Sequence, residues 1–185
     1  MFLDRDGTIN TSPPAGEYLT RATDVALIDG VAGAIRRLNQ AEIWVGIVTN
    51  QRGIALGLMT LEELDSVHKR LFDELEITGA KIDAVYVCPH EIGVCRCRKP
   101  LPGLLLQAQR DVDGLDFALA AMIGDSPSDV AAGRAVGATA ILLDPADGGV
   151  AAANGGDEGA DHRAPSLTAA LDWLSVPVPA AAGPG

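Results

Sequence analysis

The sequence lacks the features of a membrane-embedded or disulfide-rich protein. None of its apolar runs is both uncharged and long enough to cross a bilayer. The N-terminus has neither the basic segment nor the long apolar stretch of a secretion signal, so we expect a cytoplasmic location. Cysteine is scarce: all three residues lie between positions 88 and 97, whereas a secreted disulfide framework normally uses an even number spread over the chain.

Positive charge is also in short supply. Fourteen lysine and arginine residues stand against twenty-five aspartate and glutamate residues, which gives a net charge of −11. The long-range field of such a chain repels polyanions, and this argues against a nucleic acid or an anionic membrane as partner. A small phosphorylated ligand stays compatible where cations gather locally, as they do at Arg96, Arg98 and Lys99.

What is present suits one α/β domain, because 185 residues can close a single hydrophobic core. The expected strands are Met1–Asp4, Glu42–Thr49, Ile82–Cys88, Ala118–Gly124 and Ala138–Leu143. The expected helices are Val31–Gln40, Leu61–Ile77, Pro102–Val112, Ser128–Val136 and Ser166–Leu174. Nearly continuous apolar strands separated by helices predict a Rossmann-like parallel sheet with helices on both faces.

The boundaries of this domain follow from composition. We expect one domain over residues 1–175 and a disordered tail over 176–185, which is rich in alanine, proline and glycine. Between Asp144 and His162 the chain is dominated by aspartate, glycine and alanine, and this predicts a mobile loop.

Polar residues follow several of the predicted strands. Asp4, Thr49 and Asp125 each stand at the end of an apolar strand, so all three are expected at one edge of the sheet. In open parallel sheets, ligands bind beyond the carboxyl ends of the strands. The sequence therefore predicts a single site there.

The segment Asp4-Arg5-Asp6-Gly7 carries a pair of carboxylates. Residues two apart on an extended segment point to the same side, so Asp4 and Asp6 can face one ligand. Adjacent carboxylates repel unless a cation or proton separates them, and Mg²⁺ prefers such hard oxygen ligands. Taken alone, the pair is equally compatible with a solvated turn.

The wider sequence resembles the haloacid dehalogenase-like phosphatase superfamily. FLDRDGTIN, VTNQ, Lys99 and IGDSPSD are similar to its four motifs, in order and at suitable spacing. The resemblance implies that Asp4 attacks phosphorus to form an aspartyl-phosphate and that Asp6 acts as general acid and base. It also implies that Thr49 and Lys99 bind the phosphoryl group and that Asp125 completes a Mg²⁺ site with Asp4 and Asp6. Asp129 is implied to orient Lys99 or a water.

A second group of residues suggests a different metal. Cys88, His90, Cys95 and Cys97 supply four ligands within ten residues, and Cys₃His is a standard arrangement for structural Zn²⁺. Thiolates favour Zn²⁺ over Mg²⁺, so this site is separate from the aspartates. We expect a zinc-braced loop over 88–98 that presents Arg98 and the following lysine to a phosphate. The alternative is a set of buried free thiols beside an incidental histidine.

The cysteine segment narrows the resemblance to the heptose-bisphosphate and histidinol-phosphate branch, whose members lack a large cap domain. Within it, EYLTRATDVALIDGV, VTNQRGIALGLMT and KPLPGLLLQA look more like the D-glycero-D-manno-heptose-1,7-bisphosphate 7-phosphatases. This implies a small phosphorylated sugar as substrate, cleavage at the 7-phosphate, and a monomeric enzyme. The implied substrate-binding residues are Ala15, Gly16, Glu17, Tyr18, Asn50, Gln51, Arg52 and Arg98.

Two alternatives stay open, a histidinol-phosphate phosphatase and a non-catalytic zinc-binding module. The sequence departs from the heptose branch at Ser126, where a lysine is usual, and at Arg52, where a serine is usual. An extra arginine and a missing lysine could exchange roles in holding a second phosphate. His68 and His162, which have no part in this scheme, are expected to be solvated.

Overall fold

The computed structural model describes residues 1–144 and 159–178. Within them, one parallel sheet has the strand order β3-β2-β1-β4-β5-β6. Its strands are β1 (Phe2–Leu3), β2 (Gly46–Asn50), β3 (Ala84–Cys88), β4 (Ala121–Gly124), β5 (Thr139–Leu143) and β6 (His162–Ala164). From β1 the chain adds β2 and β3 on one side of the sheet and then β4, β5 and β6 on the other. The position between β1 and β4, where the order changes side, is the switch point at which doubly wound sheets bind ligands.

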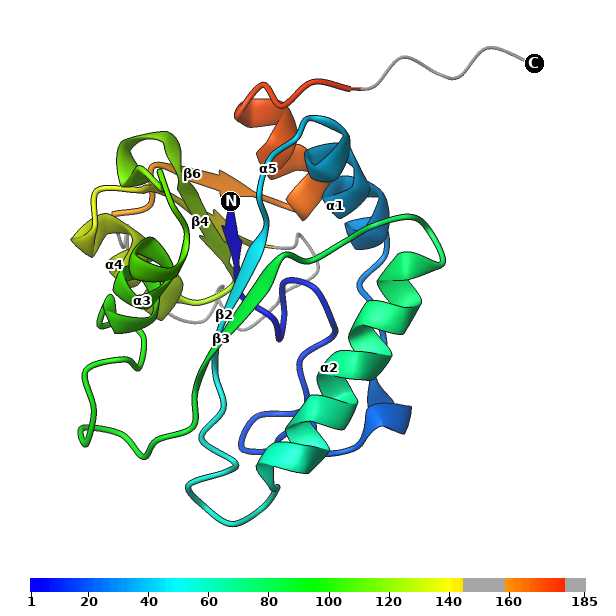
Figure 1. The fold of residues 1–185 in the computed structure, drawn as a ribbon, viewed down its shortest axis with the longest axis vertical. Helices are drawn as coiled ribbons and strands as arrows, with labels where there is room; N and C mark the ends of the chain where they lie inside the picture. The colour runs from blue at the N-terminus through cyan, green and yellow to red at the C-terminus, as the bar shows by residue number, and fades with distance from the viewer. Residues whose placement is uncertain (145–158, 179–185) are drawn as a thin grey trace.

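Helices cover both faces of the sheet (Figure 1). The helices are α1 (Val31–Gln40), α2 (Leu61–Glu76), α3 (Gly103–Asp111), α4 (Pro127–Ala135) and α5 (Leu167–Trp173), with short 3₁₀ turns at η1 (Ala22–Asp24) and η2 (Phe117–Leu119). In Figure 1, α1, α2 and α5 lie on one side of the strands, and α3 and α4 lie on the other. The predicted α/β fold with helices on both faces is therefore confirmed.

The alternation of side chains along β1 explains the two layers of core. Leu3 joins Ile47 and Ile123 in a buried cluster with residues of α1, α2 and α5. Phe2 points the other way and joins a second cluster with residues of α3 and α4. Because both faces of a central strand are buried, its sequence is a continuous apolar run.

Capping residues set the helix ends much as the sequence indicates. The hydroxyl of Thr60 accepts from the Glu63 amide, and the Glu63 carboxylate accepts from the Thr60 amide. Ser166 caps α5 by accepting from the Ala169 amide. Pro102 stands before α3, which begins at Gly103.

Three predicted strands begin at least two residues later than expected. The strand expected from Ala118 begins only at Ala121, because Phe117–Leu119 forms the 3₁₀ turn η2. Residues 42–45 precede β2, because Glu42 adopts a left-handed φ of 56° in the turn after α1. Asp83 accepts from the Val45 amide, and β3 begins only at Ala84. Strand pairing, rather than apolar content, decides where the ladder starts.

The predicted loop between Asp144 and His162 is wrong at its end. His162–Ala164 forms β6, a short edge strand parallel to β5. The ring of His162 stacks on Trp173 with centroids 4.5 Å apart, so this histidine is not simply solvated as predicted. Residues 145–158 of that loop lie outside the described part of the chain.

The C-terminal end of the described chain packs on the domain. Val176 is buried in the same cluster as α1 and α5, and its carbonyl accepts from Arg37 at 3.1 Å. Residues 179–185 of the predicted tail lie outside the described residues, and the domain boundary at 175 stays a prediction. None of the helices within 1–144 and 159–178 has the length and apolar character needed to span a membrane.

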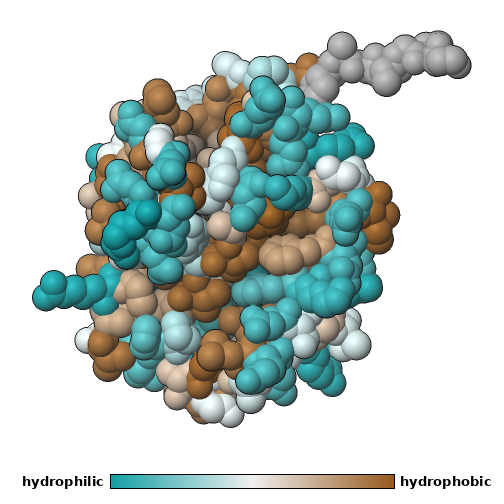
Figure 2. Space-filling model, in the orientation of Figure 1, coloured by the Kyte–Doolittle hydropathy of each residue, from teal (hydrophilic) through white to brown (hydrophobic). Residues whose placement is uncertain are grey.

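Hydrophobic side chains remain exposed on the segments that follow the strands. Figure 2 shows them among hydrophilic residues at the end of the molecule where, in Figure 1, the connection from β2 to α2 and that from β3 to α3 lie. They are Leu56, Leu58, Ile92, Val94 and Leu101. These connections are loops, and no cap domain is inserted among the described residues.

Candidate active site

The site lies at the switch point of the sheet. Asp4 follows β1 and Asp125 follows β4, and the Asp4 amide donates to the Ile123 carbonyl at 2.9 Å. The carboxylate oxygens of Asp4, Asp125 and Asp129 lie within 4.8 Å of one another. We call these three residues the aspartate cluster. Its oxygens are the donors that Mg²⁺ prefers.

Gly7 makes this arrangement possible. Its φ is +80°, which favours glycine, and a side-chain carbon at this position would overlap Oδ2 of Asp125. The Gly7 amide donates to the Asn10 carbonyl at 2.7 Å, which turns the chain back on itself. The glycine after the second aspartate is therefore needed for space as well as for conformation.

Lys99 is a buried cation beside Asp4. Its Nζ lies 2.7 Å from Oδ1 of Asp4, 2.5 Å from Oδ1 of Asp129 and 2.6 Å from the Val48 carbonyl. Burial favours the neutral amine, but the two carboxylates outweigh it and raise the pKa of Lys99 above its ordinary value. Asp129 thus contacts Lys99 directly from the first turn of α4.

The carboxylates carry more negative charge than Lys99 neutralises. Burial raises the pKa of Asp4 to about 7, an effect that Lys99 opposes and that Asp129 and Asp6 reinforce. Burial and the charge of Asp4 raise the pKa of Asp125 to about 6. A divalent cation would offset this repulsion, so the donor set fits Mg²⁺.

The side chain of Asp6 does not belong to the aspartate cluster. Its Oδ1 accepts from Arg5 Nε at 3.1 Å and from Asn10 Nδ2 at 2.9 Å. Its Oδ2 accepts from an Arg5 terminal nitrogen at 2.7 Å and from Gln51 Nε2 at 3.0 Å. Gln51 also reaches Oγ1 of Thr49 at 2.8 Å, which brings Thr49 to the same edge. The structure does not bring the Asp6 side chain into the predicted metal set.

Two predicted substrate residues have structural partners. Asn50 is joined to Lys99 by two hydrogen bonds of 3.1 Å, one in each direction between its amide group and the lysine backbone. Gln51 is buried and makes the contacts just described. The Asn50 amide thus ties the end of β2 to Lys99, and the Gln51 amide ties it to Asp6.

Arg52 is paired with a residue that the sequence did not single out. Its guanidinium binds the Glu91 carboxylate through contacts of 2.5 and 3.0 Å. Glu91 lies in the loop over 88–98 that carries the cysteines, so the ion pair connects this loop to the loop that follows β2. The ring of Tyr18 packs over Gly53 beside this pair.

The other predicted substrate residues differ in exposure. Ala15, Gly16 and Glu17 form an exposed turn before Tyr18. A terminal nitrogen of Arg98 is buried and lacks a hydrogen-bond partner among the described residues. Such a donor is costly unless a ligand or water completes it. Ser126, in the position where lysine is usual, caps α4 by accepting from the Ser128 amide at 3.2 Å.

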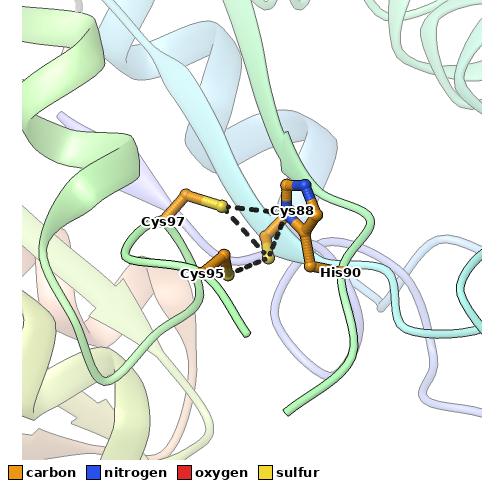
Figure 3. A group of neighbouring side chains, drawn as sticks. All are labelled: Cys88, His90, Cys95 and Cys97. Atoms are coloured by element: carbon orange, nitrogen blue, oxygen red, sulfur yellow. Dashed lines mark hydrogen bonds between the residues drawn. The ribbon is translucent and has the colours of Figure 1, made fainter. Parts of the chain in front are cut away.

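The cysteine cluster is assembled as predicted from its spacing (Figure 3). The sulfur of Cys88 lies 3.6 Å from that of Cys95 and 3.4 Å from that of Cys97. Nδ1 of His90 lies 3.7 Å from the Cys88 sulfur and 3.2 Å from the Cys97 sulfur. Tetrahedral Zn²⁺, with Zn–S bonds of about 2.3 Å, separates its ligands by about 3.5–3.8 Å. The four donors therefore fit one tetrahedral ion.

Two of the three thiols hold protons that a metal would displace. Burial raises the pKa of Cys97 to about 12, and hydrogen bonds to the two other thiols add to the effect. Burial also raises the pKa of Cys88. At Cys95, desolvation is outweighed by hydrogen bonds from the Arg98 backbone and from Cys97, which lower its pKa to about 6. Metal binding at this cluster is accordingly coupled to proton release.

Comparison with known proteins identifies the family. The HAD-hydrolase-like family model matches residues 96–170. A D-glycero-β-D-manno-heptose-1,7-bisphosphate 7-phosphatase of Rhodopseudomonas palustris is 38% identical over 144 residues, which cover 74% of this chain and 78% of that protein. The chain belongs to the haloacid dehalogenase-like hydrolases.

Other members of this haloacid dehalogenase-like family support the predicted branch. A D-glycero-α-D-manno-heptose-1,7-bisphosphate 7-phosphatase of Mycobacterium bovis is 36% identical over 141 residues, covering 76% of this chain and 74% of that protein. The solved structure of a D,D-heptose 1,7-bisphosphate phosphatase from B. bronchiseptica, complexed with magnesium and phosphate, has a TM-score of 0.85 and 33% identity, with 95% of this chain and 97% of that chain covered. The resemblance drawn from the motifs is confirmed.

Sequence reasoning missed three side chains around the site. Arg5 is fully buried against Asp6, His68 is buried against Arg5, and Glu91 binds Arg52. The expectation of a solvated His68 is wrong, because α2 turns this residue toward the core. An arginine between two aspartates was the available signal for Arg5.

Proposed function

We propose that this protein is a Mg²⁺-dependent phosphatase that removes the 7-phosphate of D-glycero-D-manno-heptose 1,7-bisphosphate. The observation that carries the proposal is the contact between Lys99 and Asp4 at the switch point, beside two further carboxylates. Relatives named for this activity, at 36–38% identity over about three quarters of the chain, support the substrate. Their names divide between α and β anomers, so both belong in the assay.

Asp4 is the proposed nucleophile. Lys99 binds its Oδ1, which leaves the second oxygen to attack phosphorus. A bond forms between Asp4 and phosphorus while the bond from phosphorus to the leaving oxygen breaks. The ammonium of Lys99 and the hydroxyl of Thr49 supply the charge and the hydrogen bond that the transferring phosphoryl group needs.

Asp6 is the proposed general acid and base. In its protonated form it gives its proton to the departing alkoxide in the first step, and the resulting carboxylate takes a proton from the water that attacks the aspartyl-phosphate in the second, which restores the acid. Its link to Thr49 through Gln51, which donates to both side chains, supports this role. Arg5, Asn10 and Gln51 fix the orientation of its carboxylate.

Two metals are proposed. Asp4 and Asp125 would hold Mg²⁺, which supplies positive charge to the phosphate oxygens. Cys88, His90, Cys95 and Cys97 would hold a structural Zn²⁺ that restrains the loop leading into Arg98 and Lys99.

The remaining substrate contacts are proposed for residues of the loops around the active site. The buried N–H of Arg98, which has no partner within residues 1–144 and 159–178, suits a phosphate oxygen. Arg52, beside Tyr18, is the second cation available to a bisphosphate, with Glu91 as the partner it would have to share. Ala15, Gly16 and Glu17 lie next to Tyr18 on an exposed turn. We further propose a cytoplasmic monomer.

Phosphate release from a substrate panel tests the function. The panel contains both anomers of the heptose bisphosphate, histidinol phosphate and several hexose phosphates, each with Mg²⁺. We expect the heptose bisphosphate to have the highest kcat/KM and Asp4→Asn to abolish turnover while retaining the fold. Equal, feeble turnover of every compound would contradict the substrate, and faster turnover of histidinol phosphate would favour that alternative. Inactivity on all of them would favour a binding module.

A further inference from the structure

Arg5 lies between the proposed acid/base and a helix distant in sequence. It is fully buried, and one edge of its guanidinium donates to both oxygens of Asp6 at 2.7–3.1 Å. The remaining terminal nitrogen lies 3.3 Å from Nε2 of His68, on α2. His68 is 7% exposed, and its ring stacks on that of Phe72 with centroids 6.3 Å apart.

The chemistry of this contact fixes the state of His68. A guanidinium has donors only and stays charged, so Nε2 must accept and the ring proton must lie on Nδ1. Burial, followed by the charge of Arg5, lowers the pKa of His68 to about 4, against a smaller opposite effect of Asp6. The ring is therefore neutral near pH 7 and able to accept the hydrogen bond.

The two ends of the Arg5 guanidinium make different contacts. Toward Asp6 it forms paired charge-assisted hydrogen bonds, which fix the plane of the carboxylate as well as its position. Toward α2 it needs an acceptor, because a buried N–H without a partner is costly. His68 is the acceptor at that end. Loss of His68 would leave that N–H without its acceptor and loosen the hold of Arg5 on Asp6, which Asn10 and Gln51 alone would then restrain.

We propose that Arg5 and His68 are positioning residues that hold Asp6 in place for its proton transfer to the leaving group. Neither residue touches the reacting atoms in this scheme. The inference rests on the proposed function, because it assumes that Asp6 is the general acid. What it adds is that α2 sets the geometry of the acid through a two-residue connection.

Leaving-group chemistry separates this role from a merely structural one. An alkyl phosphate needs its departing oxygen protonated, whereas p-nitrophenyl phosphate releases a stable phenolate without help from an acid. Misplacing Asp6 should therefore lower kcat/KM for an alkyl ester much more than for the aryl ester, since kcat/KM reports the first phosphoryl transfer. The alkyl ester is the best sugar phosphate found in the panel.

The variants are His68→Leu, which cannot accept a hydrogen bond, and His68→Gln, whose side-chain oxygen can. We expect His68→Leu to lower kcat/KM on the alkyl ester about 10-fold more than on the aryl ester, a part of the 100-fold or larger effect typical of general acids. His68→Gln should restore most of the loss. Phe72→Leu, on the same helix without a bond to Arg5, is the packing control and should alter both esters equally.

Equal losses on the two esters in His68→Leu, or no recovery in His68→Gln, would overturn the inference. If His68→Leu does not fold, Arg5→Lys decides, because it keeps the charge and loses the paired donors. A selective loss on the alkyl ester would support positioning, and a uniform loss would refute it. Failure of the proposed function looks different: the wild type would hydrolyse neither ester, or Asp6→Asn would show no leaving-group selectivity.

Discussion

A side-chain carbon on Gly7 would overlap Oδ2 of Asp125, which links the turn after β1 to the strand end of β4. The two residues come from opposite sides of the switch point, and their close approach brings the carboxylate of Asp125 to that of Asp4. Any side chain at position 7 must displace Asp125.

Replacing Gly7 should therefore damage turnover. We expect Gly7→Ala to lower kcat about 100-fold, because a displacement of about 1 Å in a catalytic site has an effect of that size. Gly137→Ala is the matched control, since Gly137 has nearly the same φ, +79°, and a side-chain carbon there would meet none of the described residues within 4 Å. Both variants should lose about 1 kcal/mol from backbone strain, but the control should keep its activity. Equal kcat in the two variants would refute the packing explanation.

Removing the metals should have separable effects. A zinc-selective chelator, with Mg²⁺ held in excess, should lower Tm by about 5–10 °C, because the loop from Cys88 to Cys97 loses its restraint. Withdrawal of Mg²⁺ alone should stop turnover with little change in Tm. Differential scanning calorimetry and metal analysis of the purified protein check both effects. An unchanged Tm after complete zinc removal would contradict the structural role of the cluster.

His68 should make stability depend on pH. The pKa of His68 is about 4 in the folded protein and 6.5 ordinarily. Between these two pH values the unfolded chain therefore binds a proton at His68 that the folded protein does not bind. The stability that neutral His68 contributes is thus fully present above pH 6.5 and is lost as pH falls toward 4. The difference between these pKa values corresponds to about 3 kcal/mol.

Urea unfolding of the wild type and His68→Gln at several pH values measures this effect. The stability of the wild type relative to the variant should fall between pH 7 and pH 4. Acid effects shared by both proteins cancel in the comparison. A relative stability that stays constant over this range would show that His68 is exposed to protonation in the folded state.

The pair between Arg52 and Glu91 should affect substrate preference more than stability. Both side chains are about one third exposed, and such ion pairs contribute little, about 0–1 kcal/mol. Glu91→Gln leaves Arg52 free for a second phosphate, so KM for the bisphosphate should fall a few-fold while KM for p-nitrophenyl phosphate stays constant. Asp73→Asn, which breaks the exposed pair with Lys69, is the control. Parallel changes for both substrates would contradict a role in selecting the bisphosphate.

The parts of the site that the sequence predicts are those with a local signature. Asp4 and Asp125 stand where apolar strands end, and the strand order brings those ends together. The cysteine cluster is also local, because its four ligands lie within one short loop. Spacing along the chain is enough in such cases to predict which side chains meet.

The parts that the sequence does not predict depend on distant pairing. The bond between Arg5 and His68 joins residues 63 apart, and nothing in the helical pattern of α2 marks His68 as an acceptor for a buried guanidinium. The pair of Arg52 and Glu91 needs two loops to meet. The edge strand β6 is short and polar, so only its ladder with β5 distinguishes it from a loop.

The central position of β1 also has a consequence for the order of assembly. Phe2 pairs on one side with Gly46 and on the other with Met122, so the segment carrying the nucleophile completes its ladder only after most of the chain has been made. Pairings so distant in sequence are slow to form, because the intervening loop must close first. During synthesis β1 thus reaches its final place only after β2 and β4, which follow it along the chain, have been made. We expect the nascent chain to gain activity late and in a single step.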